Sequence, residues 1–105
     1  MHIQIVTFTL KNLTDAEFRT LCGQLAPAFT AIPGFISKVW LADPATNTYG
    51  GVYTWKSRPA MEAYMQSELF GNVVNHPKFA DVTSKDFSIL AEPTQVTRGL
   101  IEASA

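Results

Sequence analysis

The order of strand-like and helix-like segments is the feature that most constrains the fold of this chain. Short runs rich in β-branched and aromatic residues alternate with stretches in which apolar residues recur at helical spacing. The predicted strands span residues 2–10, 35–42, 48–55 and 82–90. One predicted helix follows the first strand and another follows the third, so the order is β-α-β-β-α-β. Right-handed crossovers and short connections fold this order into a ferredoxin-like α+β domain, a four-stranded antiparallel sheet with both helices on one face.

Local signals mark the ends of the two predicted helices. Residues 14–17, Thr-Asp-Ala-Glu, fit a capping box at the start of the first helix. Pro27 lies inside this helix and predicts a kink, because proline removes a backbone donor and crowds the preceding turn. Pro33-Gly34 ends the helix. Ser57 caps the second helix, which we expect to run, or to stop and restart, as far as His76-Pro77.

The length of the chain limits the number of domains. Its 105 residues leave room for one core, so we expect a single domain over residues 1–105. Hydrophobic residues make up 47% of the chain and charged residues 16%, which is apolar for so small a domain. Part of the apolar surface is therefore expected to lie against another chain. Residues 91–105 form a tail without clear periodicity.

The predicted strands are apolar on both faces. On the first strand, Ile3 and Ile5 lie on one side, and Val6 and Phe8 lie on the other. Because two helices cover only one face of the sheet, the other face predicts a homodimer that pairs two sheets. We expect the tail to contact the partner subunit. The alternative is that the tail folds back over the sheet of its own chain.

Composition and motifs exclude several classes of function. The net charge is −1 and the isoelectric point about 6, so nothing resembles a nucleic-acid binder. No apolar run approaches the ~20 residues that span a bilayer, and the N-terminus does not resemble a secretory signal. The nucleotide, metal and nucleophile motifs GxGxxG, HExxH and GxSxG are missing. We therefore expect a cytoplasmic protein with no nucleic-acid or membrane partner and no bound metal.

Four side chains could take part in chemistry, and each has a structural alternative. His2 is expected to be solvated at the terminus. His76 precedes a proline at a helix end, where a capping or loop role competes with that of a base. Cys22 lies on the apolar stripe of the first helix and is expected to be a small core residue. Lys38 is expected to reach the rim of the sheet, although desolvation would lower its pKa and make it a base.

The aromatic residues are the more suggestive signal. They either pack the core and an interface, or they line a cavity that suits a flat aromatic ligand. Both interpretations predict burial, and only the second predicts a void. The set comprises Phe8, Phe35, Trp40, Tyr49, Tyr53, Trp55, Tyr64, Phe70 and Phe79.

Several segments together resemble a known family. They are Pro33-Gly34-Phe35, Lys38-Val39-Trp40, Gly50-Gly51 and Ala63-Tyr64. The chain resembles the YdhR-like monooxygenases of the dimeric α+β barrel superfamily, which includes the antibiotic-biosynthesis monooxygenases. The similarity covers nearly the whole chain, including a proline in the first helix, and implies the same fold and a homodimer.

The resemblance also makes haem chemistry unexpected. Haem-degrading relatives use an Asn on the first strand and a Trp and a His on the second helix. The aligned positions here are Val6, Tyr64 and Val74, and His76 lies two residues further on, in a different direction on a helix. We therefore expect no haem, flavin or other cofactor.

The resemblance implies a function and a set of site residues. The predicted function is a cofactor-independent monooxygenase acting on a small hydroxylated aromatic or quinol-like compound. The alternative is a non-catalytic dimer that binds a small molecule. Tyr64 and His76 are the candidate catalytic residues. The expected substrate-binding residues are Val6, Phe8, Trp40, Tyr53, Trp55 and Tyr64.

Overall fold

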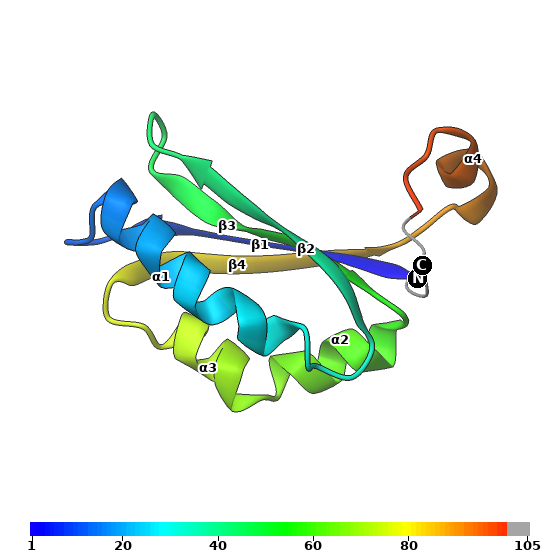
Figure 1. Cartoon of the computed structure of the whole chain (residues 1–105), viewed down its shortest axis with the longest axis horizontal. Helices are drawn as coiled ribbons and strands as arrows, with labels where there is room; N and C mark the ends of the chain where they lie inside the picture. Colours follow the sequence, from blue (N-terminus) through cyan, green and yellow to red (C-terminus); the bar gives the residue numbers. More distant parts are fainter. Residues whose placement is uncertain (101–105) are drawn as a thin grey trace.

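The computed structural model describes residues 1–100 of the chain. Four strands form one sheet, and three helices lie along one of its faces (Figure 1). The strands are β1 (His2–Leu10), β2 (Phe35–Asp43), β3 (Thr48–Trp55) and β4 (Phe79–Ser88). The helices are α1 (Asp15–Phe29), α2 (Arg58–Met65), α3 (Glu68–Val74) and α4 (Ala91–Val96).

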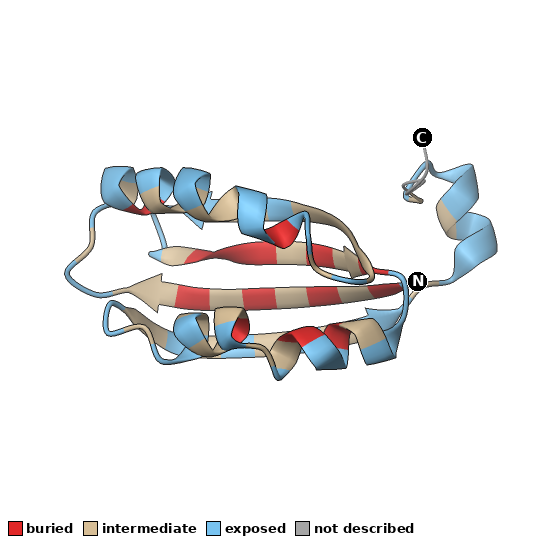
Figure 2. Ribbon diagram, turned by 60° about the horizontal axis from the view of Figure 1, so that its bottom comes forward, coloured by how far each residue is buried: buried red, intermediate tan, exposed pale blue. Residues whose placement is uncertain are grey.

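The sheet has the order β2-β3-β1-β4, and every pairing in it is antiparallel. This arrangement confirms the ferredoxin-like α+β fold, with β1 and β3 in the centre. Helices α1, α2 and α3 cover one face and leave the opposite face without a helix (Figure 1), and a view from the helix side shows buried residues recurring along the central strands (Figure 2).

The fourth strand begins earlier than the sequence pattern predicts. It starts at Phe79 and ends at Ser88, instead of spanning residues 82–90. The register of its pairing with β1 shifts between Thr7 and Thr9, and Asp81 adopts a φ of 54°. This irregularity interrupts the alternation of apolar and polar residues, so the first part of the strand does not look like a strand in the sequence.

The second predicted helix is two helices in the structure. The α2 helix starts at the predicted cap, since the Ser57 side chain accepts a hydrogen bond from the Ala60 backbone N–H. The chain then stops and restarts, because the Ser67 hydroxyl caps α3 through the Phe70 N–H. The capping box of α1 is also confirmed, and Pro27 lies in the last turn of that helix.

The two faces of β1 match the predicted alternation. Gln4, Val6 and Phe8 are buried beneath the helices, whereas Ile3 and Ile5 are only partly buried on the opposite face. The prediction that His2 is solvated is wrong. His2 is 5% exposed, and its Nε2 lies 2.6 Å from Asp86 Oδ2.

The open face of the sheet carries a row of three apolar residues that ends at the exposed Lys85, the β4 partner of Ile5. Ile5 pairs with Val52, and Val52 in turn pairs with Val39 on the edge strand. Val39 is 58% exposed and Phe87, on the other edge strand, is 54% exposed. We call this surface the open sheet face.

The short helix α4 gives the tail a regular structure that its sequence does not predict. It projects beyond the end of the sheet (Figure 1). Leu90 and Val96 are 77% and 83% exposed. Residues 101–105 lie outside the described part of the chain. In residues 1–100, no helix is both long and apolar enough to cross a membrane.

Candidate active site

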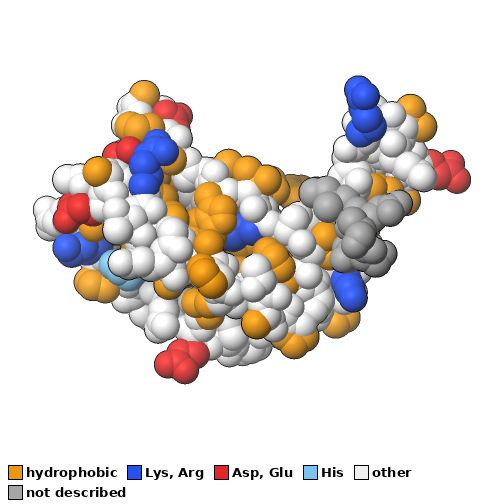
Figure 3. All heavy atoms as spheres, viewed as in Figure 1, with side chains coloured by type: hydrophobic (Ala, Val, Ile, Leu, Met, Phe, Trp, Pro, Cys, Tyr) orange, Lys and Arg blue, Asp and Glu red, His pale blue; other side chains and the backbone are white. Residues whose placement is uncertain are grey.

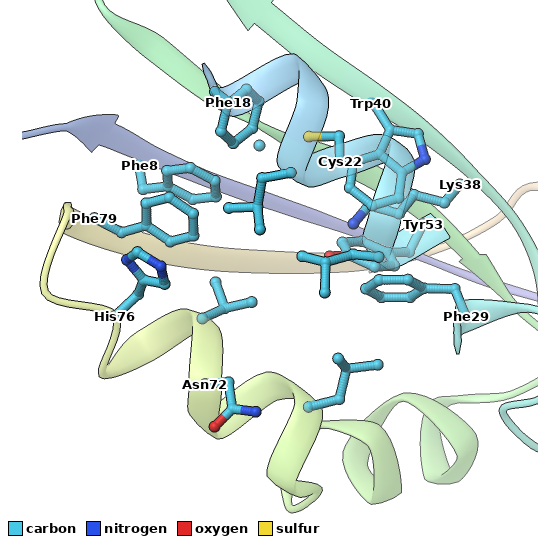
Figure 4. A pocket seen from close by; sticks show the side chains of 15 residues that line it. Phe8, Phe18, Cys22, Phe29, Lys38, Trp40, Tyr53, Asn72, His76 and Phe79 are labelled. Atoms are coloured by element: carbon cyan, nitrogen blue, oxygen red, sulfur yellow. The ribbon is translucent and has the colours of Figure 1, made fainter. Parts of the chain in front are cut away.

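A cavity of about 130 Å³ lies between the sheet and the helices α1 and α3. Its wall is mostly apolar, with a few polar groups (Figure 4). The hydrophobic lining residues are Phe8, Phe18, Leu21, Leu25, Phe29, Trp40, Leu69, Val73 and Phe79. The remaining lining residues are Cys22, Lys38, Gly50, Tyr53, Asn72 and His76.

The ammonium group of Lys38 is enclosed by three aromatic rings from three elements. Its Nζ lies 3.4 Å from the ring centroid of Trp40, 3.9 Å from that of Phe29 and 4.6 Å from that of Tyr53. We call this arrangement the lysine cage. Within residues 1–100 the Nζ has no hydrogen bond and no carboxylate partner, so its charge is stabilised mainly by the ring faces.

Burial lowers the pKa of Lys38 from its ordinary value of 10.5 to about 7, because the cage removes water from the ammonium. The nearby thiol of Cys22 opposes this shift only in part. The same burial raises the pKa of the Cys22 thiol, so Cys22 stays protonated at neutral pH. Lys38 can thus exchange a proton with a ligand near pH 7.

Two tyrosines meet beside the cage. The hydroxyl oxygens of Tyr53 and Tyr64 are 3.3 Å apart in the core. Burial raises the pKa of both phenols, so both hydroxyls remain protonated over the pH range in which proteins are stable. Tyr53 lines the cavity and Tyr64 lies behind it, so Tyr53 can offer a hydrogen bond to a ligand while Tyr64 orients it.

His76 lies at the opposite end of the cavity from Lys38 (Figure 4). Its ring stacks on Phe79 with the centroids 4.2 Å apart, and its Nδ1 accepts a hydrogen bond from the Lys78 backbone N–H. His76 therefore has both the predicted loop role and a position in the cavity wall. The His76 imidazole and the Lys38 ammonium therefore lie at opposite ends of the cavity.

The structure brings together part of the predicted substrate-binding set. Phe8, Trp40 and Tyr53 line the cavity, and so does the candidate catalytic residue His76. Val6, Trp55 and Tyr64 do not line it and are at most 1% exposed in the core.

Trp55 is held away from the cavity by its hydrogen bond to Gln4, at 3.0 Å, and Tyr64 is enclosed by the Trp55 and Phe70 rings. The structure thus places Tyr64 outside the cavity wall, with its hydroxyl beside that of Tyr53, which lines the cavity.

Apart from His76, sequence reasoning did not assign the residues of α1, α3 and the loop after α3 to the wall of a cavity. Leu21, Leu25 and Phe29 recur at helical spacing, and Leu69, Asn72, Val73 and His76 do so as well. This spacing could have placed Asn72 beside Val73 on the cavity side of α3. The sequence gives no sign that these faces leave a void between them.

The cavity residues do not fit a haem. The volume of about 130 Å³ is close to that of a cavity that holds one benzene ring, and a tetrapyrrole is several times larger. Val74, at the position aligned with the haem ligand of relatives, is 46% exposed and is absent from the lining. In residues 1–100, no three His, Cys, Asp or Glu side chains are grouped as metal ligands.

Comparison with protein families gives a match over most of the chain. The model of the family described as "Putative mono-oxygenase ydhR" matches residues 3–100. The chain belongs to the ydhR family. A comparison with curated proteins finds no significant match.

Solved structures with the fold of this ydhR-family chain include a haem degrader, a cofactor-independent oxygenase and an antibiotic biosynthesis monooxygenase. The haem degrader MhuD from Mycobacterium tuberculosis, with two haems bound, is 18% identical with a TM-score of 0.69; the match covers 86% of this chain and 96% of MhuD. The cofactor-independent oxygenase SnoaB from Streptomyces nogalater is 18% identical with a TM-score of 0.64, over 84% and 92% of the two chains. An antibiotic biosynthesis monooxygenase is 16% identical with a TM-score of 0.69, over 86% and 99%. At these identities the likeness shows the fold alone.

Proposed function

We propose that this protein is a cofactor-independent monooxygenase of a small hydroxylated aromatic, quinol-like compound, and that Lys38 is its base. The observation that carries the proposal is the lysine cage. A lysine with a pKa of about 7, enclosed by rings at the wall of an apolar cavity, can accept a proton from a phenolic hydroxyl. The resulting ammonium then lies beside the phenolate and stabilises it.

The cavity shape supports a flat ring as the ligand. Phe8 and Phe79, which both line the cavity, stack with their centroids 4.3 Å apart and their planes 17° apart. Such walls accept one aromatic ring in a water-poor space. The volume limits the enclosed part of the substrate to about one ring, the size held by a benzene-binding cavity of about 150 Å³.

The reaction itself uses the electrons of the substrate. The electron-rich phenolate passes an electron to O₂, and the two radicals combine to a hydroperoxide. Loss of water then leaves one oxygen atom on the ring. A quinol and O₂ thus give a hydroxyquinone and water, with the substrate as the only reductant. The protein binds and orients the ring, removes its proton and excludes water.

We also propose that the protein works as a homodimer joined through the open sheet face. Its partly exposed residues Ile5, Val39, Val52 and Phe87 are apolar on a face that no helix covers. A stable interface of this kind buries at least about 1,200 Å² in total. The α4 helix, with Leu90 and Val96 exposed, would add contacts to the partner subunit.

Oxygen consumption tests the enzymatic proposal. Metal-free protein is mixed with a panel of hydroquinones and dihydroxynaphthalenes, and O₂ uptake and products are followed. We expect turnover that rises with pH through about 7, as Lys38 loses its proton. Lys38→Met keeps most of the side-chain volume and should lower the rate at least about a hundredfold.

Lys56→Met is the matched control, because Lys56 is exposed and lies outside the cavity. It should leave the rate unchanged. Tight binding of the ring compounds without any O₂ uptake would contradict the enzyme proposal and favour the alternative, a non-catalytic binding protein. Equal rates for Lys38→Met and the wild type would remove Lys38 from the mechanism.

A further inference from the structure

A second hollow lies on the helix-covered side of the molecule, beside the cavity. It is a groove of about 320 Å³ between the C-terminal end of α1 and the helix α2. Ala28 and Ala31 form one bank, and Ala60 and Ala63 form the other. Hydrophobic side chains gather over this part of the surface (Figure 3).

The groove is wide because its banks carry small side chains. At one end, the Gly34 turn approaches α2 so closely that a Cβ on Gly34 would lie 2.5 Å from the Ala60 Cβ. The absence of a side chain at Gly34 therefore lets the turn after α1 lie close to the start of α2. Farther along, the alanines leave open space that larger residues would fill.

The groove and the cavity share a wall. Leu69 lines both of them. Tyr64 forms part of the groove, and its hydroxyl meets that of Tyr53, which lines the cavity. Phe29, also at the cavity, lies with its ring centroid 5.9 Å from that of Tyr64.

The side chains that line the groove offer its occupant no free polar group. None of its lining residues is charged. The Ser67 hydroxyl donates to the Tyr64 carbonyl and accepts from the Phe70 N–H, and the Tyr64 hydroxyl pairs with Tyr53. A ligand segment that fits here must therefore be apolar.

We propose that the groove binds an apolar chain carried by the ring compound that occupies the cavity. The substrate is thus a hydroxylated ring with an alkyl or prenyl substituent that passes Leu69. This inference rests on the proposed function. A chain of the same molecule suits the groove better than a second protein copy, because the groove lies on the helix side, opposite the open sheet face.

Binding of 4-alkylphenols tests the proposal. Phenol, 4-butylphenol and 4-octylphenol are titrated into the full chain by calorimetry. We expect the affinity to rise along the series by up to about fourfold for each methylene group that the groove buries. Ala63→Leu should fill the groove, leave phenol binding unchanged and abolish most of the gain. Ala31→Leu is a second blocking variant if Ala63→Leu does not fold.

Ala16→Leu makes the same change at an exposed α1 position outside the groove and is the matched control. In NMR spectra, 4-octylphenol should shift the Ala28, Ala31 and Ala63 methyl signals, and phenol should not. Phenol binding with no dependence on chain length, or a gain that survives both blocking variants, overturns the groove proposal alone. No binding of any member overturns the proposed function as well.

Discussion

Gly51 and Lys38 depend on each other for their positions. A Cβ on Gly51 would lie 2.6 Å from the Cε of Lys38, closer than real Cβ contacts. Gly51 faces the helices between Val6 and Trp40, its partners on the neighbouring strands. The missing side chain lets the lysine stem lie flat across β3 and brings its ammonium over the Trp40 ring. Gly51 therefore marks a close approach between the β3 backbone and the Lys38 side chain.

Gly51→Ala should move Lys38 out of the lysine cage. The added methyl group meets the flexible end of the lysine, so its steric cost should be no more than about 1 kcal/mol, and below pH 7 the release of the ammonium to water should stabilise the protein by more than that. As the ammonium reaches water, its pKa should rise from about 7 toward 10.5, since desolvation is the cause of the shift. Titration of the lysine Cε resonance by NMR measures this pKa. Gly71→Ala, where a Cβ meets nothing within 4 Å, should leave the titration unchanged. An unaltered titration in Gly51→Ala would contradict the account.

The burial of Lys38 also predicts how stability varies with pH. Between pH 7 and pH 10.5 the unfolded chain keeps a proton on this lysine that the folded chain has lost. The wild type should therefore gain stability as pH rises through this window, relative to Lys38→Met. At pH 6, Lys38→Met should be more stable than the wild type by roughly 4–5 kcal/mol, and the difference should become small above pH 10.5. Urea unfolding at several pH values measures this difference, and the control Lys56→Met, which keeps Lys38, should follow the wild type.

The elements that sequence reasoning predicts best are those fixed by local signals. The capping box at Thr14 and the cap at Ser57 locate two helix starts, because each bond is made within three residues. The alternation along β1 gives the face of Val6 and Phe8, since every second residue is buried.

The features that the sequence does not predict depend on residues that are far apart in the chain. His2 is buried because its ring meets Asp86, 84 residues away, and no local pattern reports this. The environment of Lys38 is made by Phe29, Trp40 and Tyr53 from three different elements. The sequence shows that Lys38 and Trp40 share a strand face, but the void above them depends on how α1 and α3 pack against the sheet.

The Tyr53–Tyr64 pair predicts a rate effect that acts through a neighbour. Tyr64→Phe removes the partner of the Tyr53 hydroxyl, which should destabilise the protein by about 1 kcal/mol and lower O₂ uptake severalfold. Tyr49→Phe is the matched control. The Tyr49 hydroxyl donates to Asp15 at 2.8 Å outside the cavity, so this variant should lose a hydrogen bond without a change in rate. An unchanged rate in Tyr64→Phe would remove Tyr64 from the mechanism.

Val52 is the position at which the proposed dimer can be broken with least effect on the protomer. It lies between Ile5 and Val39 on the open sheet face, and its side chain points away from the helices. Val52→Lys leaves the core untouched but places unpaired charges at the centre of the interface, at a cost of several kcal/mol. We expect light scattering to give twice the 11.6 kDa chain mass for the wild type and the single mass for Val52→Lys. Val74→Lys, the same change at a 46% exposed position on α3, should remain a dimer. A wild-type chain that is monomeric at micromolar concentration would show that the open sheet face has another role.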